Sequence, residues 1–319
     1  MNYQDMIREL SMPVAPAGFE TPIIEKLEAL AREKGAETSR TALGNLVVHR
    51  PGTGKKIALV AHADTKGFVV LDKADNGFCR LGELGGHPLA ACIGMPVRFA
   101  NGARGIMGCD GGMKADCKIT DMFVNVTSGE ADLGDVCVAA LPCYSEGDLI
   151  VSSMLNNRAG CAVLLDVLDR TDTDADLYIV FTVQYELGQR GAASSVFEIQ
   201  PDAVIVCECL PTSDTPGAGL KCTVKMGEGP VLPVKVGGGT ANLALVAAVE
   251  KAGKDSENPA QRAVYPGGGT DMFPIQISCA GIYSCAVGIP TRTYGLMSMA
   301  NASDLKKTAD LLLAAVKAL

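Results

Sequence analysis

The sequence contains no tryptophan, and aromatic residues make up only 5% of its 319 positions. Apolar residues amount to 48%, so a large core can form, but mainly from aliphatic side chains. Histidine is also scarce, with only His49, His62 and His87 in the chain. Because a Ser–His or Cys–His catalytic pair needs a histidine beside its nucleophile, this small set gives little support to such a triad.

Long apolar runs are absent as well, and none approaches the ~18–20 residues of a membrane-spanning helix. The opening segment, MNYQDMIREL, is polar and amphipathic and lacks the apolar centre of a signal peptide. A formal net charge of -8 argues against nucleic acid or an anionic membrane as the main partner. The twelve cysteines are scattered, often inside apolar runs, and are expected to be reduced thiols. We therefore expect a cytoplasmic protein.

Buried strands and helices alternate through much of the chain. Apolar runs predict strands at 45–50, 56–62, 177–184, 203–209 and 282–287, and helical spacing predicts helices at 21–35, 157–168, 240–251 and 303–319. Thr21 is expected to cap the first of these helices, with Pro22 at its first position. Alternation of this kind indicates an α/β fold, with a mostly parallel or mixed sheet covered by helices on both faces.

The pattern changes between Leu71 and Gly147. Short apolar runs there alternate with glycine and aspartate, and no convincing long helix is present. This texture predicts a small β-rich domain, residues 71–147, inserted into an α/β domain made of residues 1–70 and 148–319. His87, in Gly-Gly-His-Pro, is expected at the surface of the insert.

The predicted strand 56–62 ends in His62-Ala63-Asp64. Open α/β sheets carry their chemistry at the carboxyl ends of their strands. A carboxylate near a histidine also orients its ring, as suits a metal ligand. A core histidine followed by a turn aspartate is equally compatible with this spacing.

Three further stretches place polar side chains where a strand or helix meets a loop. Taken singly, each has a simpler explanation: Asn156 could cap a helix, Glu186 could form a surface ion pair, and Glu208 could lie on a strand edge. Together with His62 and Asp64, they predict a cleft with several acids and one histidine, which suits a divalent-metal hydrolase. The glycine run 237–239 lacks the lysine of a P-loop and the GxGxxG spacing, so it gives little support to a nucleotide site.

The order of these motifs resembles the glutamyl and deblocking aminopeptidase family, dinuclear metallo-aminopeptidases that form dimers and hollow tetrahedral dodecamers. The similarity runs nearly end to end. Segments of this chain that resemble family motifs are APAGFE (15–20), HADTKGF (62–68, beside HMDEIGF), LNNRAGCAVLL (155–165, beside LDDRAGCAVLL), FTVQYELGQRGA (181–192, beside FTVQEEVGLRGA), SDTPG (213–217), GGTDM (268–272) and IPTRTYG (289–295). The resemblance implies a zinc-aminopeptidase-like fold with an inserted β-barrel or PDZ-like domain. It also implies a homo-oligomer, dimer or dodecamer, that acts on peptides.

In that family a zinc or cobalt pair activates a bridging water to remove N-terminal residues from peptides. The resemblance places His62 on the first metal ligand and Asp64 on the acid that orients it. It places Glu186 on a metal-binding glutamate and Glu208 on a metal-binding aspartate, one methylene shorter in the family. These four positions retain groups of the expected kind.

Three other positions depart from the family. Asn156 falls on the metal-bridging aspartate, Tyr185 on the general-base glutamate and Gly295 on the final histidine ligand. An amide is a poor bridge between two dications, a phenol with a pKa near ~10 is a poor base, and glycine binds nothing. The resemblance thus implies a degenerate site that holds at most one ion, through His62 and Glu208 with Asn156.

Two alternatives remain open. An active hydrolase could use altered metal ligands, with Cys207 or Cys209 beside Glu208. Side chains alternate between the two faces of a strand, however, so both cysteines are expected to point away from the face that carries Glu208. A non-catalytic scaffold or binding subunit could instead assemble with an active paralogue, since the β-rich insert is intact.

Overall fold

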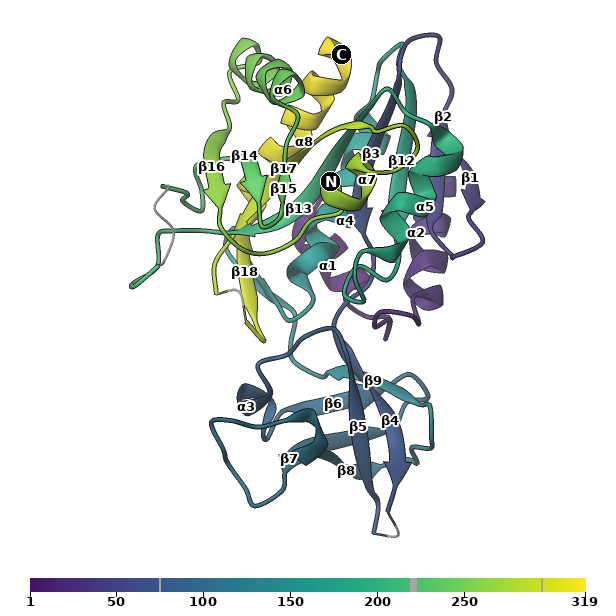
Figure 1. Cartoon of the computed structure of the whole chain (residues 1–319), viewed down its shortest axis with the longest axis vertical. Helices are drawn as coiled ribbons and strands as arrows, with labels where there is room; N and C mark the ends of the chain where they lie inside the picture. The colour runs from purple at the N-terminus through teal and green to yellow at the C-terminus, as the bar shows by residue number, and fades with distance from the viewer. Residues whose placement is uncertain (75, 219–222, 294) are drawn as a thin grey trace.

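The computed structural model describes residues 1–74, 76–218, 223–293 and 295–319. In these residues an α/β unit lies above a small β barrel (Figure 1). The α/β unit is built on a nine-stranded sheet of order β1-β2-β12-β3-β13-β17-β14-β15, with β16 paired to β14. The strands are β1 (Glu37–Arg40), β2 (Leu46–Arg50), β3 (Lys56–His62), β12 (Asp176–Thr182), β13 (Ala203–Pro211), β14 (Val231–Val236), β15 (Gly239–Thr240), β16 (Gln261–Tyr265) and β17 (Tyr283–Thr291).

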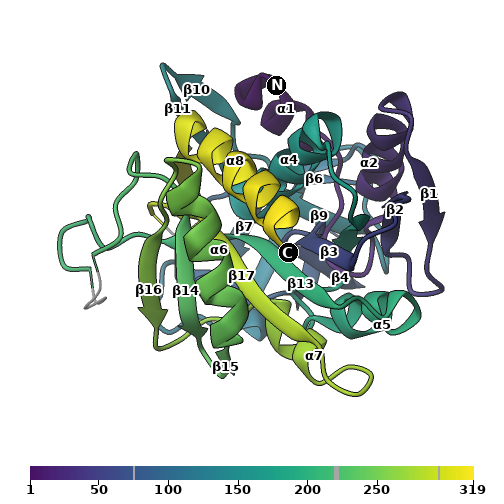
Figure 2. The same cartoon turned by 90° about the horizontal axis from the view of Figure 1, so that it is seen from above.

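The sheet is mixed, as the sequence predicts. Its central strands β12, β3, β13 and β17 pair in parallel, while β1, β2 and β14 join by antiparallel pairing. Helices α2, α4, α6 and α8 cover one face, and α5 and α7 cover the other (Figure 2). The helices are α1 (Tyr3–Leu10), α2 (Thr21–Glu33), α4 (Leu155–Arg170), α5 (Arg190–Ile199), α6 (Leu243–Asp255), α7 (Met272–Gln276) and α8 (Ala302–Ala318). Both faces of the central strands are therefore buried, which explains their continuous apolar runs.

The second unit is a closed barrel of strand order β4-β5-β8-β7-β6-β9. Its elements are β4 (Gly67–Lys73), β5 (Phe78–Leu84), helix α3 (Leu89–Cys92), β6 (Pro96–Phe99), β7 (Arg104–Cys109), the 3-10 turn Ile119–Asp121, β8 (Met122–Ser128) and β9 (Val136–Ala139). A small sheet of β10 (Tyr144–Glu146), β11 (Leu149–Ser152) and β18 (Ser298–Asn301) follows it. Strand β4 begins at Gly67, five residues after β3 ends. The barrel therefore lies next to the carboxyl edge of the sheet.

The core is aliphatic, as the lack of tryptophan requires. Every residue of β3 from Ile57 to Ala61 has no exposed surface. Of the helices in the described residues, none is both long and apolar enough to cross a membrane.

Three expectations from the sequence are wrong. Thr21 does not cap α2, because Glu20 is the N-cap residue and its carboxylate instead accepts from the backbone N–H groups of Gly18 and Gln184. Helix α6 begins at Leu243 rather than at residue 240, because Asn242 caps it by accepting from Leu245 N. His87 is not a surface residue: its side chain is 7% exposed and stacks on Phe68, with ring centroids 4.1 Å apart.

Candidate functional site

The polar residues singled out from the sequence come together at the carboxyl edge of the sheet. His62 ends β3, and Glu208 lies near the end of the adjacent parallel strand β13. Asn156 stands at the start of α4, and Glu186 in the loop that follows β12. His49 does not join them, since it pairs with Asp176 at the opposite end of β12.

His62 is the centre of this group and is only 2% exposed. Its Nδ1 lies 3.5 Å from Asp64 Oδ1, and its Nε2 lies 3.8 Å from Glu208 Oε1. Among the described residues, neither ring nitrogen has a hydrogen-bond partner. A buried histidine without hydrogen bonds is costly, so this geometry indicates that Nε2 is directed at a group from outside the chain.

Asp64 holds the loop around this histidine in place. One of its carboxylate oxygens accepts from Tyr185 N at 3.0 Å and the other from Glu186 N at 2.9 Å. These two hydrogen bonds orient both residues of the loop that follows β12. Asp64 therefore positions three candidate side chains at once, although the sequence suggests only its link to His62.

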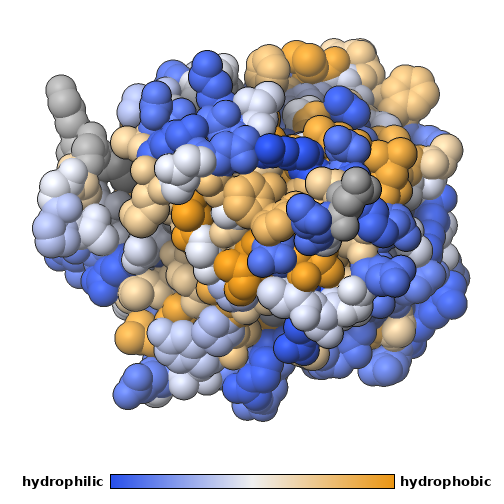
Figure 3. Space-filling view, turned by 90° about the horizontal axis from the view of Figure 1, so that it is seen from below, coloured by the Kyte–Doolittle hydropathy of each residue, from blue (hydrophilic) through white to orange (hydrophobic). Residues whose placement is uncertain are grey.

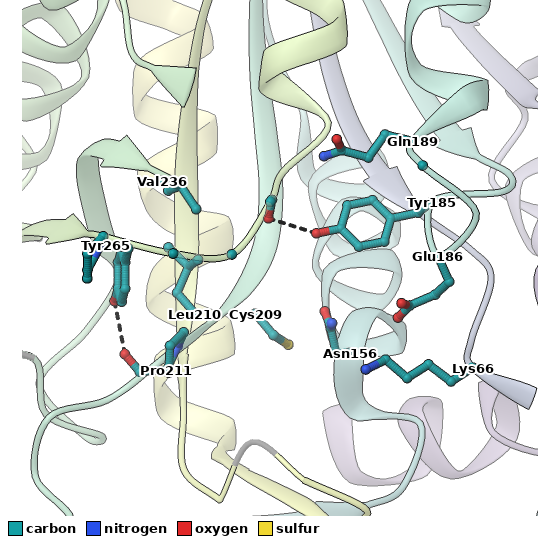
Figure 4. Close-up of a pocket in the computed structure, with 15 residues that line it drawn as sticks. Lys66, Asn156, Tyr185, Glu186, Gln189, Cys209, Leu210, Pro211, Val236 and Tyr265 are labelled. Carbon is teal, nitrogen blue, oxygen red and sulfur yellow. Dashed lines mark hydrogen bonds between the residues drawn. The ribbon is translucent and has the colours of Figure 1, made fainter. Parts of the chain in front are cut away.

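Tyr185 lies directly against His62. The two rings stack with centroids 3.8 Å apart and an interplanar angle of 6°. The phenol O–H reaches across the cleft and donates to the carbonyl oxygen of Gly269 at 2.7 Å (Figure 4).

Asp271, to which the sequence pattern assigned no role, is 1% exposed and accepts from Thr182 Oγ1 at 2.6 Å. Its other oxygen has no hydrogen-bond partner in the described part of the chain. The signal for Asp271 was present, because it lies in the GGTDM segment. Lys66 was missed too, although it adjoins the His62-Ala63-Asp64 motif.

Burial and charge together make this site attractive to a cation. Burial raises the pKa of Glu208 to about 7 and that of Asp271 to about 6, although His62 opposes both shifts. Burial also disfavours protonation of His62, but Asp64, Glu208 and Asp271 outweigh it and raise the pKa of the imidazole to about 9. Burial thus raises the pKa of the two carboxyl groups, and the surrounding carboxylates raise that of the imidazole, and a bound cation would counter the cost of burying these negative charges.

Two cavities open beside the site. One, of about 590 Å³, extends past Tyr185 toward Leu210, Val236 and Tyr265. The other, of about 400 Å³, runs between the sheet edge and the barrel, and its lining includes His87 and Gly295. Three residues line both cavities: Lys66, Asn156 and Glu186.

Comparison with known proteins identifies the family. Residues 44–311 match the family model described as M42 glutamyl aminopeptidase. The chain belongs to the M42 glutamyl aminopeptidase family. It is 31% identical to the "Putative aminopeptidase" of Acetivibrio thermocellus over 98% of both chains, and 27% identical to the glutamyl aminopeptidase of Lactococcus lactis over 92% of this chain and 89% of that one.

Solved structures agree with this assignment. The aminopeptidase from Desulfurococcus kamchatkensis superposes with a TM-score of 0.93 at 26% identity, covering 99% of this chain and 94% of that chain. The Pyrococcus horikoshii TET1 peptidase, which assembles into a tetrahedron or a large octahedral shell, has the same fold, with a TM-score of 0.89 at 20% identity and full coverage of both chains. The resemblance and the fold inferred from the sequence are thus confirmed.

M42 aminopeptidases are metal-dependent, so the donor set of this chain can be tested against a metal. Nowhere in the described residues do three His, Cys, Asp or Glu side chains converge to hold an ion. Three donor atoms are nevertheless buried and without a partner there: His62 Nε2, Glu208 Oε2 and Asn156 Oδ1. This set fits one divalent cation held by two strong donors and one neutral donor.

A second metal ion, which the resemblance implies for the family, would find few donors here. Glu186 lines the cleft, but Gly295 has no side chain, and no atom lies within 4 Å of where its Cβ would be. Lys66 brings an ammonium group into the same cleft. Tyr294, which precedes Gly295 in the IPTRTYG segment, lies outside the described residues.

Proposed function

We propose that this chain retains the peptide cleft of the metallo-aminopeptidases but has an impaired metal site. It would hold at most one zinc or cobalt ion and trim peptides poorly or not at all. The observation that carries this proposal is the position of Tyr185. Where the family has its general-base glutamate, a phenol is stacked on His62 and donates its proton to Gly269 O.

The donors for a single ion would be His62 Nε2 and Glu208, with Asn156 Oδ1 as a weak third. A dication bound there supplies a Lewis acid that polarises a peptide carbonyl. Asp64 would keep the imidazole oriented, since it lies 3.5 Å from Nδ1 and is itself fixed by two backbone N–H groups. The chain would therefore still bind and orient a peptide or a smaller ligand.

Proton transfer is the step that the chain supports least. A tyrosine phenol has an ordinary pKa near ~10 and is a poor proton acceptor. The Tyr185 hydroxyl acts as a donor to Gly269 O. Loss of a positioned base typically costs roughly 10²–10⁴-fold in rate. A water molecule beside the ion would find no carboxylate at position 185 to take its proton.

Ligation by the neighbouring cysteines is less well supported. Cys209 Sγ donates to the carbonyl oxygen of Leu155 at 3.5 Å, and burial raises the pKa of Cys209 to about 12. Burial raises the pKa of Cys207 as well. Zinc binds the thiolate rather than the thiol, so both residues are poor candidates for replacement ligands.

Assembly into a dimer or dodecamer is proposed from the family. The barrel, which runs from β4 to β9, carries several exposed apolar side chains: Leu71, Phe78, Ile106, Met113 and Leu133. Viewed from the barrel side, hydrophobic surface is interspersed with polar surface (Figure 3). The TET1 peptidase, which shares the fold, forms shells, and an intact barrel is compatible with similar contacts here.

Elemental analysis of the purified full-length chain tests this proposal. We expect one zinc or cobalt ion or none per chain, and little turnover of aminoacyl-anilides with added zinc, cobalt or manganese. Two tightly bound ions per chain, or robust peptide trimming, would overturn it. Light scattering of the same sample tests assembly, and a strictly monomeric protein would contradict the proposed oligomer.

A further inference from the structure

Two side chains of opposite charge lie beside each other in the cleft without forming an ion pair. Lys66 and Glu186 line both cavities, yet neither side chain has an ion-pair or hydrogen-bond partner among the residues the structure describes. In water, two such charges lose little free energy when they stay apart. Glu186, however, is partly buried, and burial raises its pKa. An unpaired carboxylate and ammonium that share a cleft form a site for a ligand that carries both opposite charges.

The barrel fixes the stems of these two side chains. Gly85, at the end of β5, has φ +88°, and a Cβ there would lie 2.9 Å from Glu186 Cβ and 3.1 Å from Lys66 Cγ. Only glycine can approach so closely in this left-handed conformation. The barrel loop therefore packs on both stems, and their charged ends are left to the cleft.

A third group completes the set. Asn156 lines both cavities with Lys66 and Glu186, and its Oδ1 is buried without a hydrogen-bond partner in the described chain. It is an acceptor on the same cleft as the Glu186 carboxylate (Figure 4). Two acceptors and one ammonium donor match the polar groups of an α-amino acid, which has one ammonium and one carboxylate.

The larger cavity continues this site on its apolar side. Its far wall includes Leu210, Val236 and Tyr265, each no more than 3% exposed. The hydroxyl of Tyr265 donates to Pro211 O at 3.0 Å, so its ring presents an apolar surface (Figure 4). At about 590 Å³ the cavity has room for a large side chain. A leucine, methionine or phenylalanine side chain would itself leave water when it packs on this apolar wall, whereas glutamate would place a charge against it.

We propose that this cleft binds the zwitterion of a large apolar α-amino acid. The ligand's ammonium donates to Glu186 and, in the metal-free chain, also to Asn156 Oδ1. Its carboxylate accepts from Lys66, and its side chain enters the larger cavity. This inference rests on the proposed function, because a second dication would occupy Glu186 and Asn156 and would be repelled by Lys66. A dipeptide carries the same two charges farther apart, so free amino acid and dipeptide are compared directly in the test.

The test is isothermal titration calorimetry on the full-length chain, both metal-stripped and with one equivalent of zinc. The ligands are leucine, leucinamide, N-acetylleucine, glutamate and leucyl-glycine. Leucinamide lacks the carboxylate and N-acetylleucine lacks the ammonium, so each should bind about 10–100-fold more weakly than leucine. Glutamate should bind more weakly as well. No binding of leucine, equal binding of leucinamide, or tighter binding of the dipeptide overturns the assignment.

Variants test the assigned roles. Lys66→Met should weaken leucine binding to the affinity of leucinamide and leave the affinity for leucinamide unchanged. Glu186→Gln should weaken leucine binding to the affinity of N-acetylleucine and leave the affinity for N-acetylleucine unchanged. Lys55→Met is the matched control, because Lys55 is an exposed lysine that lines a different cavity. Wild-type affinity for leucine in Lys66→Met contradicts the inference. If the chain holds at most one ion and does not bind leucine, this inference alone is overturned. If the chain holds two tightly bound ions, the proposed function is overturned.

Discussion

The phenol ring of Tyr185 lies flat on the imidazole of His62, with centroids 3.8 Å apart and planes inclined by 6°. This pairing joins the strongest metal-binding candidate of the chain to the residue that the resemblance places at the general-base position. The hydrogen bond from the Tyr185 hydroxyl to Gly269 O holds the phenol over the imidazole ring. Under the proposed function, this contact places an aromatic ring where an acid would be needed to accept a proton.

Tyr185→Phe removes only the hydroxyl and keeps the stacked ring. We expect the free energy of unfolding to fall by about 0.5–1.5 kcal/mol, the usual net value of one hydrogen bond. The affinity of the first cation should change little, because the hydroxyl donates to Gly269 O and contributes to Glu208 only a hydrogen bond that lowers the pKa of this carboxyl group. Urea denaturation and metal titration measure the two effects, and a Tyr185→Phe variant that loses cation binding would show that the hydroxyl ligates.

Restoring the family residues at the three departures should restore function. Asn156→Asp, Tyr185→Glu and Gly295→His together should bind a second cation and raise aminoacyl-anilide turnover by roughly 10²–10⁴-fold. A histidine fits at 295, because no atom lies within 4 Å of its Cβ position and the backbone there has no positive φ. Adding Lys66→Ile should tighten the second ion further by removing a nearby positive charge.

The readouts for this restored variant are elemental analysis and steady-state kinetics, with circular dichroism to verify folding. A folded triple variant that still holds no more than one ion would show that the loss lies elsewhere in the site. Tyr185→Glu alone is the informative intermediate, since it returns a base without a second metal position.

Asp64→Asn probes the residue that positions the site. Asparagine can accept with only one of its two side-chain termini, so one of the N–H groups of Tyr185 and Glu186 would face an amide N–H group. We expect a loss of about 1–3 kcal/mol in stability. First-ion affinity should fall by about 10–100-fold, as for other residues that orient a metal ligand. Denaturation and zinc titration of the same preparation check both, and unchanged zinc affinity would remove Asp64 from its assigned role.

Stability should depend on pH through Asp214. Arg292 donates to both of its carboxylate oxygens and holds the pKa of Asp214 well below its usual range. A depressed folded-state pKa stabilises the protein above the unfolded-state pKa, near ~3.9, and that contribution is lost as pH falls below it. Asp214→Asn should therefore cost about 1–2 kcal/mol at pH 7 and progressively less as the pH is lowered below that value.

Urea denaturation at neutral and acidic pH measures this difference. Asp172→Asn is the matched control, because the Asp172 side chain is 98% exposed and lies 3.8 Å from Lys317. The control should change stability little at either pH. A cost for Asp214→Asn that is equally large at pH 7 and well below the unfolded-state pKa would contradict the assignment.

Much of the fold follows from local sequence. The apolar run Ile57–Ala61 predicts a buried strand, and the alternation of such runs with helices predicts the sheet that contains it. The location of His62 at a strand end is equally local, and parallel pairing of β3 with β13 then brings Glu208 to the same edge. Periodicity and turn residues are properties of a few neighbouring positions, so sequence reasoning reaches them.

What only the tertiary structure decided involves segments distant in the chain. Hydrogen bonds across the fold commit the Glu20 carboxylate to Gln184 N and join the Tyr185 hydroxyl to Gly269 O. Packing of the barrel buries the His87 side chain and brings Gly85 against Lys66 and Glu186. These contacts depend on how the barrel and the sheet edge meet, which no local pattern encodes. The sequence alone thus determined the family and the sheet, and tertiary packing decided which groups share the cleft.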